Sequence, residues 1–148
     1  MVKTELLQKT IINALKADAA LIAVLGTTGQ VKESQWQGTI FTYPAVRVDI
    51  DPQTPIGNGI DHLKLSDCYW RVRVYSEQDS SHQCNQLAGL TFDALFNKQF
   101  TGTDTAGADY LRLIRVDIID IGRTLRIAER LWMAESTFYS QVNLINPP

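Results

Sequence analysis

Long apolar runs, a strong excess of one charge and disulfide-rich spacing are all absent from this 148-residue sequence. No stretch approaches the roughly 20 apolar residues that a membrane-spanning helix needs. The N-terminal residues MVKTELLQKT carry charges where a secretory signal peptide has its apolar segment, so we expect synthesis in the cytosol. A formal net charge of -2 gives no electrostatic basis for specific nucleic-acid binding or for attachment to an anionic membrane.

Cysteine and histidine are scarce, with two of each in the chain. Their positions, Cys68, Cys84, His62 and His82, match no common zinc pattern such as paired C-x2-C units. Both cysteines fall on predicted core faces, where a free thiol behaves as a small hydrophobe. A reducing cytosol argues against a disulfide between them, although the sequence does not give their separation. We therefore expect no metal and no cofactor.

Catalytic sequence motifs are also missing. The chain has no G-x-S-x-G nucleophile elbow and no P-loop, and GNGIDH from Gly57 lacks the third glycine of a dinucleotide fingerprint. Asp49, Asp51, Asp61 and His62 could hold a cation or transfer protons from the end of a strand. Aspartates in such places more often cap and solvate loops, so we expect no enzymatic activity.

The clearest pattern in the chain is a strand followed at once by a helix. In CYWRVRVYSE, from Cys68, apolar residues alternate with a second set that faces away from the core: Tyr69, Arg71, Arg73 and Tyr75. Ser80 or Ser81 can then cap a helix whose apolar stripe includes Cys84, Leu87, Ala88, Thr91, Ala94 and Leu95. A helix so close behind a strand can fold back over its apolar face, which places this pair at the centre of the core.

The remaining regular elements are predicted from the same periodicities. Helices are expected over 4–16 and 19–25, the second between an Asp18 N-cap and a Gly26 C-cap. Strands are expected over three segments: 45–50, 110–120 and 131–142. One domain can accommodate a chain of this length. The fold predicted is α+β, with a mostly antiparallel sheet of about four strands and helices packed on one face.

Irregular structure is predicted between these elements. The segment 31–42 is poorly periodic, 97–109 is a polar loop, and 143–148 is expected to be a flexible end. The segment 51–62 is long for a loop in a compact domain, and such loops are usually functional or disordered. We treat it as a contact candidate through five residues: Asp51, Pro55, Asn58, Asp61 and His62.

Basic and aromatic residues off the predicted core form two further contact candidates. The first is the outward row of the central strand, described above. The second is an arm over 122–130, which carries Arg123, Arg126 and Arg130. Arginines in these places are most simply solvated and ion-paired, but arginine is also favoured in subunit contacts. Outward tyrosines likewise imply that another part of the chain or a partner subunit covers that face.

Several short motifs resemble those of phage tail-completion proteins, the tail terminators of long-tailed phages. The A-D-x-A-L-x-x-L-G segment is matched by Ala17, Asp18, Ala20, Leu21, Val24, Leu25 and Gly26. A Y-P-x-V before a strand and a W-x-V-x-V-Y-S strand end are matched by Tyr43, Pro44, Ala45, Val46, Trp70, Val72, Val74, Tyr75 and Ser76. A Leu-Ala pair in the next helix and a late W-(x)-F strand are matched by Leu87, Ala88, Trp132 and Phe138.

The resemblance implies a non-enzymatic assembly protein of the virion, assembled in the host cytoplasm. Such proteins form a ring, usually hexameric, that caps the tail tube, stops its elongation and joins it to head-side neck proteins. The implied partners are further copies of the chain, the tail tube protein and a head-side connector or stopper, with the sheath protein as a further candidate. The outward row and the arm would make ring contacts, and the 51–62 loop would meet the tube or the head side.

Three other functions stay open at this point. The chain could be another connector or stopper of the neck. It could be a small enzyme or metal-binding domain that uses the aspartates and His62. It could also be a regulatory domain that binds a small ligand, which would need a defined apolar pocket and a small oligomer such as a dimer.

Overall fold

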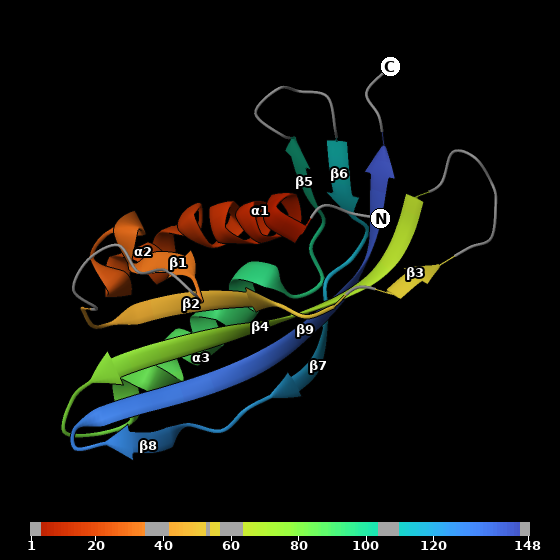
Figure 1. Cartoon of the computed structure of the whole chain (residues 1–148). Helices are drawn as coiled ribbons and strands as arrows, with labels where there is room; N and C mark the ends of the chain where they lie inside the picture. The colour runs from red at the N-terminus through yellow and green to blue at the C-terminus, as the bar shows by residue number, and fades with distance from the viewer. Residues whose placement is uncertain (1–3, 35–41, 53, 57–63, 104–109, 146–148) are drawn as a thin grey trace.

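The computed structural model describes residues 4–34, 42–52, 54–56, 64–103 and 110–145. Within these ranges, α-helices α1 (Thr4–Lys16), α2 (Ala19–Leu25) and α3 (His82–Leu95) pack on one face of a sheet (Figure 1). A short 3-10 turn, η1 (Thr28–Gln30), follows α2. The α+β class predicted from the sequence is confirmed.

The sheet is larger than the four strands expected. Its described part has nine: β1 (Val31–Glu33), β2 (Ala45–Ile50), β3 (Thr54–Ile56), β4 (Lys64–Glu77), β5 (Phe100–Thr103), β6 (Tyr110–Leu113), β7 (Asp117–Ile121), β8 (Leu125–Ala128) and β9 (Leu131–Ile145). The main path runs β1-β2-β4-β9-β6-β5, with β3 paired to β4 and both β7 and β8 paired to β9. Every pairing is antiparallel except β1 with β2.

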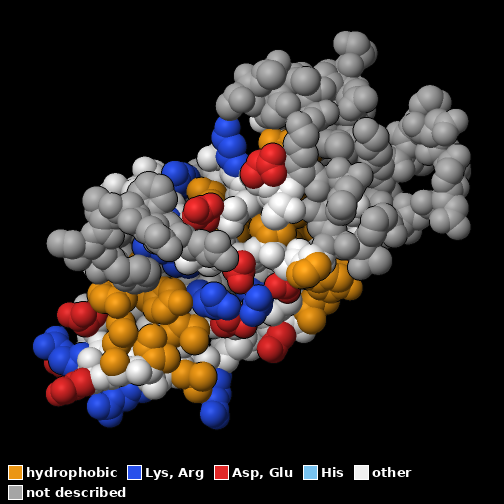
Figure 2. Space-filling model, in the orientation of Figure 1, with side chains coloured by type: hydrophobic (Ala, Val, Ile, Leu, Met, Phe, Trp, Pro, Cys, Tyr) orange, Lys and Arg blue, Asp and Glu red, His pale blue; other side chains and the backbone are white. Residues whose placement is uncertain are grey.

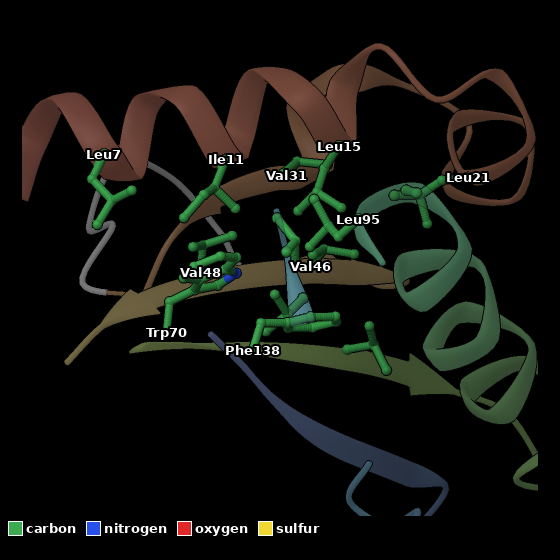
Figure 3. Close-up of a cluster of buried hydrophobic side chains, with 14 of the residues drawn as sticks. Leu7, Ile11, Leu15, Leu21, Val31, Val46, Val48, Trp70, Leu95 and Phe138 are labelled. Carbon is green, nitrogen blue, oxygen red and sulfur yellow. The ribbon is translucent and has the colours of Figure 1, made fainter. Parts of the chain in front are cut away.

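The core lies between the helices and the apolar face of β2, β4 and β9. Trp70 of β4 and Phe138 of β9 are directly paired, have no exposed surface, and stack with ring centroids 6.0 Å apart. Leu7, Ile11 and Leu15, one stripe of α1, point toward these strands (Figure 3). Full burial of an aliphatic or aromatic side chain is worth about 1.5–3 kcal/mol, so this stripe fixes α1 on the sheet.

Helix ends follow the sequence with one exception. Asp18 accepts a hydrogen bond from Leu21 N at 2.9 Å, and Gly26 ends α2 with φ +89°. Both roles were expected. Ser81 precedes α3 but its side chain makes no capping bond, and Ser80 Oγ lies 3.5 Å from His82 N. The predicted hydroxyl cap is therefore weak at best, because 3.5 Å is long for such a bond.

Several expected irregular segments contain strands, which is where the prediction was wrong. β1 lies in 31–42, β3 in the 51–62 loop and β5 in the 97–109 loop. Each has only three or four residues, too short to show a period of two. β9 also runs to Ile145, so 143–145 is strand and not the flexible end expected there, and 146–148 lie outside the described residues.

The predicted strand over 110–120 is divided into β6 and β7, with Ile114 to Val116 between them. β6, β7 and β8 pair in turn with successive parts of the same edge of β9. Gly122, at the junction of β7 and β8, shows how closely the backbone there approaches β9. A Cβ on Gly122 would lie 1.9 Å from the backbone oxygen of Glu135 in β9, so no larger residue fits.

Gly122→Ala should therefore destabilise the fold by about 1–3 kcal/mol, because β7 and β8 must move off β9 to admit the methyl group. Gly89→Ala is the matched control: nothing lies within 4 Å of its added Cβ, and the site is within α3. There alanine should add about 0.5–1 kcal/mol through helix propensity. Urea unfolding of both variants measures the difference. Equal stabilities would show that the close approach is not needed.

Candidate interaction surface

The outer face of the sheet is the side of β2, β4 and β9 that faces away from the helices. Cross-strand register arranges its side chains in rows, because residues directly opposite each other lie on the same face. The rows run Ala45–Tyr75–Met133, Arg47–Arg73–Glu135, Asp49–Arg71–Thr137 and Tyr69–Tyr139. The sequence predicted that Tyr69, Arg71, Arg73 and Tyr75 share a face, and the structure places them together there.

Two arginines of the outer face are bound to carboxylates of the same chain. Arg71 Nε donates to Asp51 at 3.1 Å and Arg71 Nη2 donates to Asp49 at 3.1 Å. Arg73 Nε donates to Glu135 at 2.6 Å. This bond to Glu135 raises the pKa of Arg73 above its ordinary value, against the lowering effect of burial. The arginines thus have partners before any other molecule arrives.

Aromatic residues occupy the next row. The rings of Tyr69 and Tyr139 lie 5.0 Å apart and tilted by 41°, and the Tyr139 hydroxyl donates to Asp67. Desolvation raises the pKa of Tyr139 to about 12, and the hydrogen bond and negative charge of Asp67 act in the same direction. Tyr69 is 36% exposed. The row offers an aromatic surface with a polar rim, a composition that is common in protein contacts.

An apolar row forms the other end of the outer face. Ala45 is opposite Tyr75, Tyr75 is opposite Met133, and Met133 is opposite Leu125 of β8. Ala45 has no exposed surface, Tyr75 and Met133 are half-buried, and Leu125 is exposed, so the surface of this row lies toward β8. Figure 2 shows hydrophobic side chains gathered toward the β8 end of the molecule, with acidic and basic side chains beside them. Apolar surface that is contiguous and rimmed by charge is typical of contact sites.

The arm over 122–130 is the β8 strand and its tight turn into β9. Arg123 and Arg126 are exposed and have no carboxylate within 4 Å among the described residues, and Arg126 Nε makes only a long contact, 3.4 Å, with the Ala128 carbonyl. Arg130 differs: it forms the turn with φ +58° and an ion pair with Asp79 at 3.0 Å. Of the three predicted arm residues, Arg123 and Arg126 therefore have no ion pair in the described part of the chain, and Arg130 forms the turn.

The 51–62 candidates are only partly described. Asp51 is bound to Arg71, so its role is to join the end of β2 to the outer face. Pro55 lies in β3, opposite Ser66 of β4, which corrects the expectation of a plain loop at that point. Asn58, Asp61 and His62 lie outside the described residues.

Sequence reasoning missed an apolar edge. Six large hydrophobic side chains in the described ranges are exposed, and four of them lie on β7 and β8: Ile119, Ile121, Leu125 and Ile127. Their signal was IIDIGRTLRIA, a β-rich run with apolar residues at both alternations. It also missed Arg47, which is only 6% exposed and donates to the Gln30 carbonyl at 3.0 Å.

The described part of the chain contains no group of three or more His, Cys, Asp or Glu residues that could hold a metal ion. Asp49 and Asp51 neutralise Arg71 instead. Cys68 and Cys84 are both free and buried, and burial raises the pKa of the Cys68 thiol to about 12. No described helix has the length and apolar character to cross a membrane.

Comparison with known proteins gives a fold likeness. No protein-family model and no curated protein matches the chain. A chain in a solved structure named "Virion of native gene transfer agent (GTA) particle" is 17% identical, with a TM-score of 0.69; the match covers 94% of this chain and 96% of that one. A second solved structure is 12% identical with a TM-score of 0.56, over 100% and 99% of the two chains. At these identities the likeness shows a common fold.

Loss of the Tyr139 hydroxyl should change the alkaline stability of the protein. The folded state holds this proton up to a pKa of about 12, against an ordinary value of 10.0. The folded state therefore binds more protons than the unfolded state between these values, and stability falls as pH rises through that range. Tyr139→Phe should make this fall shallower in thermal melts from pH 9 to 12. Tyr69→Phe is the control, and an equal change in both variants would contradict the assignment.

Proposed function

We propose that this chain is a non-enzymatic assembly protein of a phage-type virion, forming a closed ring that caps the tail tube. The observation that carries the proposal is the fold likeness to a chain of a virion particle, which extends over nearly the whole length of both chains. The tail-terminator motifs of the sequence add to it. Tyr43 and Pro44, for example, directly precede β2, and Trp70 is at the centre of β4.

A ring of identical subunits needs two different complementary patches on each subunit, because its contacts run head to tail and close. We assign these patches to the outer face, with Tyr69, Arg71, Arg73 and Tyr75, and to the arm. The exposed Leu125 and Ile127 on the arm and the exposed Tyr69 on the outer face support this assignment, since exposed apolar side chains, above all on an edge strand, are prone to association. The hexameric number comes from the resemblance.

The ring would stop tube elongation on one side and present its other side to a head-side connector or stopper protein. The segment 51–62, with Asp51, Pro55, Asn58, Asp61 and His62, is the proposed contact with the tube or the head side. The sheath protein is a further candidate partner. A connector role elsewhere in the neck is the second candidate, because the name of the similar structure gives the virion particle but not where in the particle that chain lies. Binding to purified tubes rather than to portal complexes separates the two.

Purified protein should behave as a closed ring, or as a monomer that becomes a ring when tail tubes are added. Light scattering across concentration measures the mass, and addition to polymerising tube protein measures the cap. Tubes should stop lengthening at about one ring per growing end. The control is Asn13→Ala, an exposed position of α1 outside both patches.

A stable dimer that leaves tube length unchanged would contradict the tail-terminator role. Charge reversal at Arg71 or Arg73 is a poor test of the outer face. Each would place a carboxylate against the carboxylates that now bind it, and so alter the fold as well as the contact. Tyr69→Ala avoids this difficulty because the side chain is partly exposed and uncharged.

A further inference from the structure

An oxygen-rich hollow lies at the edge of the sheet opposite the arm. Its walls come from the start of α1 and the ends of β1 and β2: Thr4, Gln8, Glu33, Ser34, Asp49 and Ile50. β4 and β9 separate this edge from β7 and β8 in the strand order. We call it the acceptor hollow, because carboxylate, amide and hydroxyl oxygens dominate its lining and no lysine or arginine contributes to it.

The oxygens of the hollow are only partly used within the chain. Glu33 is exposed and has no ion pair in the described part of the protein. Gln8 donates its amide hydrogen to the Val48 carbonyl at 2.9 Å, which leaves its side-chain oxygen as an acceptor. Asp49 is ion-paired with Arg71 at 3.1 Å and with Arg73 at 3.8 Å, so among the described residues Glu33 is the carboxylate of the hollow without an ion pair. Such a set of acceptors suits a cation with several donors, and guanidinium has five in a planar fork.

The arm supplies cations of that kind. Arg126 stands between Leu125 and Ile127, which are 43% and 47% exposed, and Arg123 lies just before the strand. Neither arginine has a carboxylate within 4 Å among the residues described. β8 is thus an exposed edge strand on which apolar side chains flank an arginine that has no ion pair within the described ranges. A partner surface for it would offer both apolar and acidic groups.

We propose that the arm of one copy docks on the acceptor hollow of the next, with Arg126 entering beside Glu33 and Arg123 at the rim. The inference rests on the proposed ring: it keeps the arm as one patch and places the docking point of the other at the acceptor hollow, which shares Asp49 with the outer face. Either patch paired with itself brings like charges together, whereas the two patches together are complementary. Because they lie on opposite sheet edges, the contact runs head to tail and can close.

A charge exchange tests this contact. Arg126→Glu and Glu33→Lys should each raise the concentration of half-assembly by about tenfold or more, since like charges then face each other. The double variant restores an opposite-charge pair at every contact, so its half-assembly concentration should return to within about threefold of the wild type. Matched controls are Arg112→Glu and Glu77→Lys, which reverse exposed charges with no ion pair in the described ranges. Sedimentation velocity measures assembly, with tail tubes added if the wild type needs them.

The outcomes separate this contact from the ring itself. If the wild type assembles and both single variants assemble as well as the wild type, the proposed contact is wrong and the proposed ring stands. Loss in the single variants without recovery in the double would also overturn it, because the two residues would then act separately. A wild type that forms no ring, alone or with tubes, would overturn the proposed function and this contact with it. Thermal melts confirm that every variant is folded.

Discussion

The pairing of β4 with β9 is the constraint on which the rest of the structure depends. All fourteen residues of β4, from Lys64 to Glu77, are opposite residues of β9. This one register places Trp70 against Phe138 on the helix side and Arg73 against Glu135 on the other. A slip of one residue would exchange the two faces, burying the charges and exposing the core, so both the core and the outer face are fixed by the same alignment.

The outer face is held by charge pairs that the chain completes by itself. Arg71 binds carboxylates at the end of β2, and Arg73 binds one on β9, so three strands are joined across their solvent side. Pairs with this much exposure contribute modestly to stability. Their larger effect is to neutralise both arginines within the chain. The outer face is thus less charged than its residue types suggest.

Local patterns predicted what is encoded locally. The stripe of α1, the Asp18 and Gly26 ends of α2, and the alternation around Trp70 each depend on residues close in the sequence, and all were found as expected. Short strands such as β1 and β3 were missed because they are defined by backbone pairing with distant strands, and three residues show no alternation of their own. Glu135 could not be predicted as the partner of Arg73, because that pairing also depends on the register of two strands far apart in the sequence. The contact residues proposed on the outer face could be grouped from alternation, but not paired.

The order of the strands in the sequence bears on how the fold is reached. β4 cannot complete its pairing without β9, which follows it by more than fifty residues, and β6, β7 and β8 also have β9 as their partner. Until β9 is in place, these strands have unpaired edges and the helices have no complete sheet to pack on. Such non-local topology folds slowly, and its unpaired strands can associate with other copies. A chain cut before Leu131 would therefore lack the central partner of the sheet.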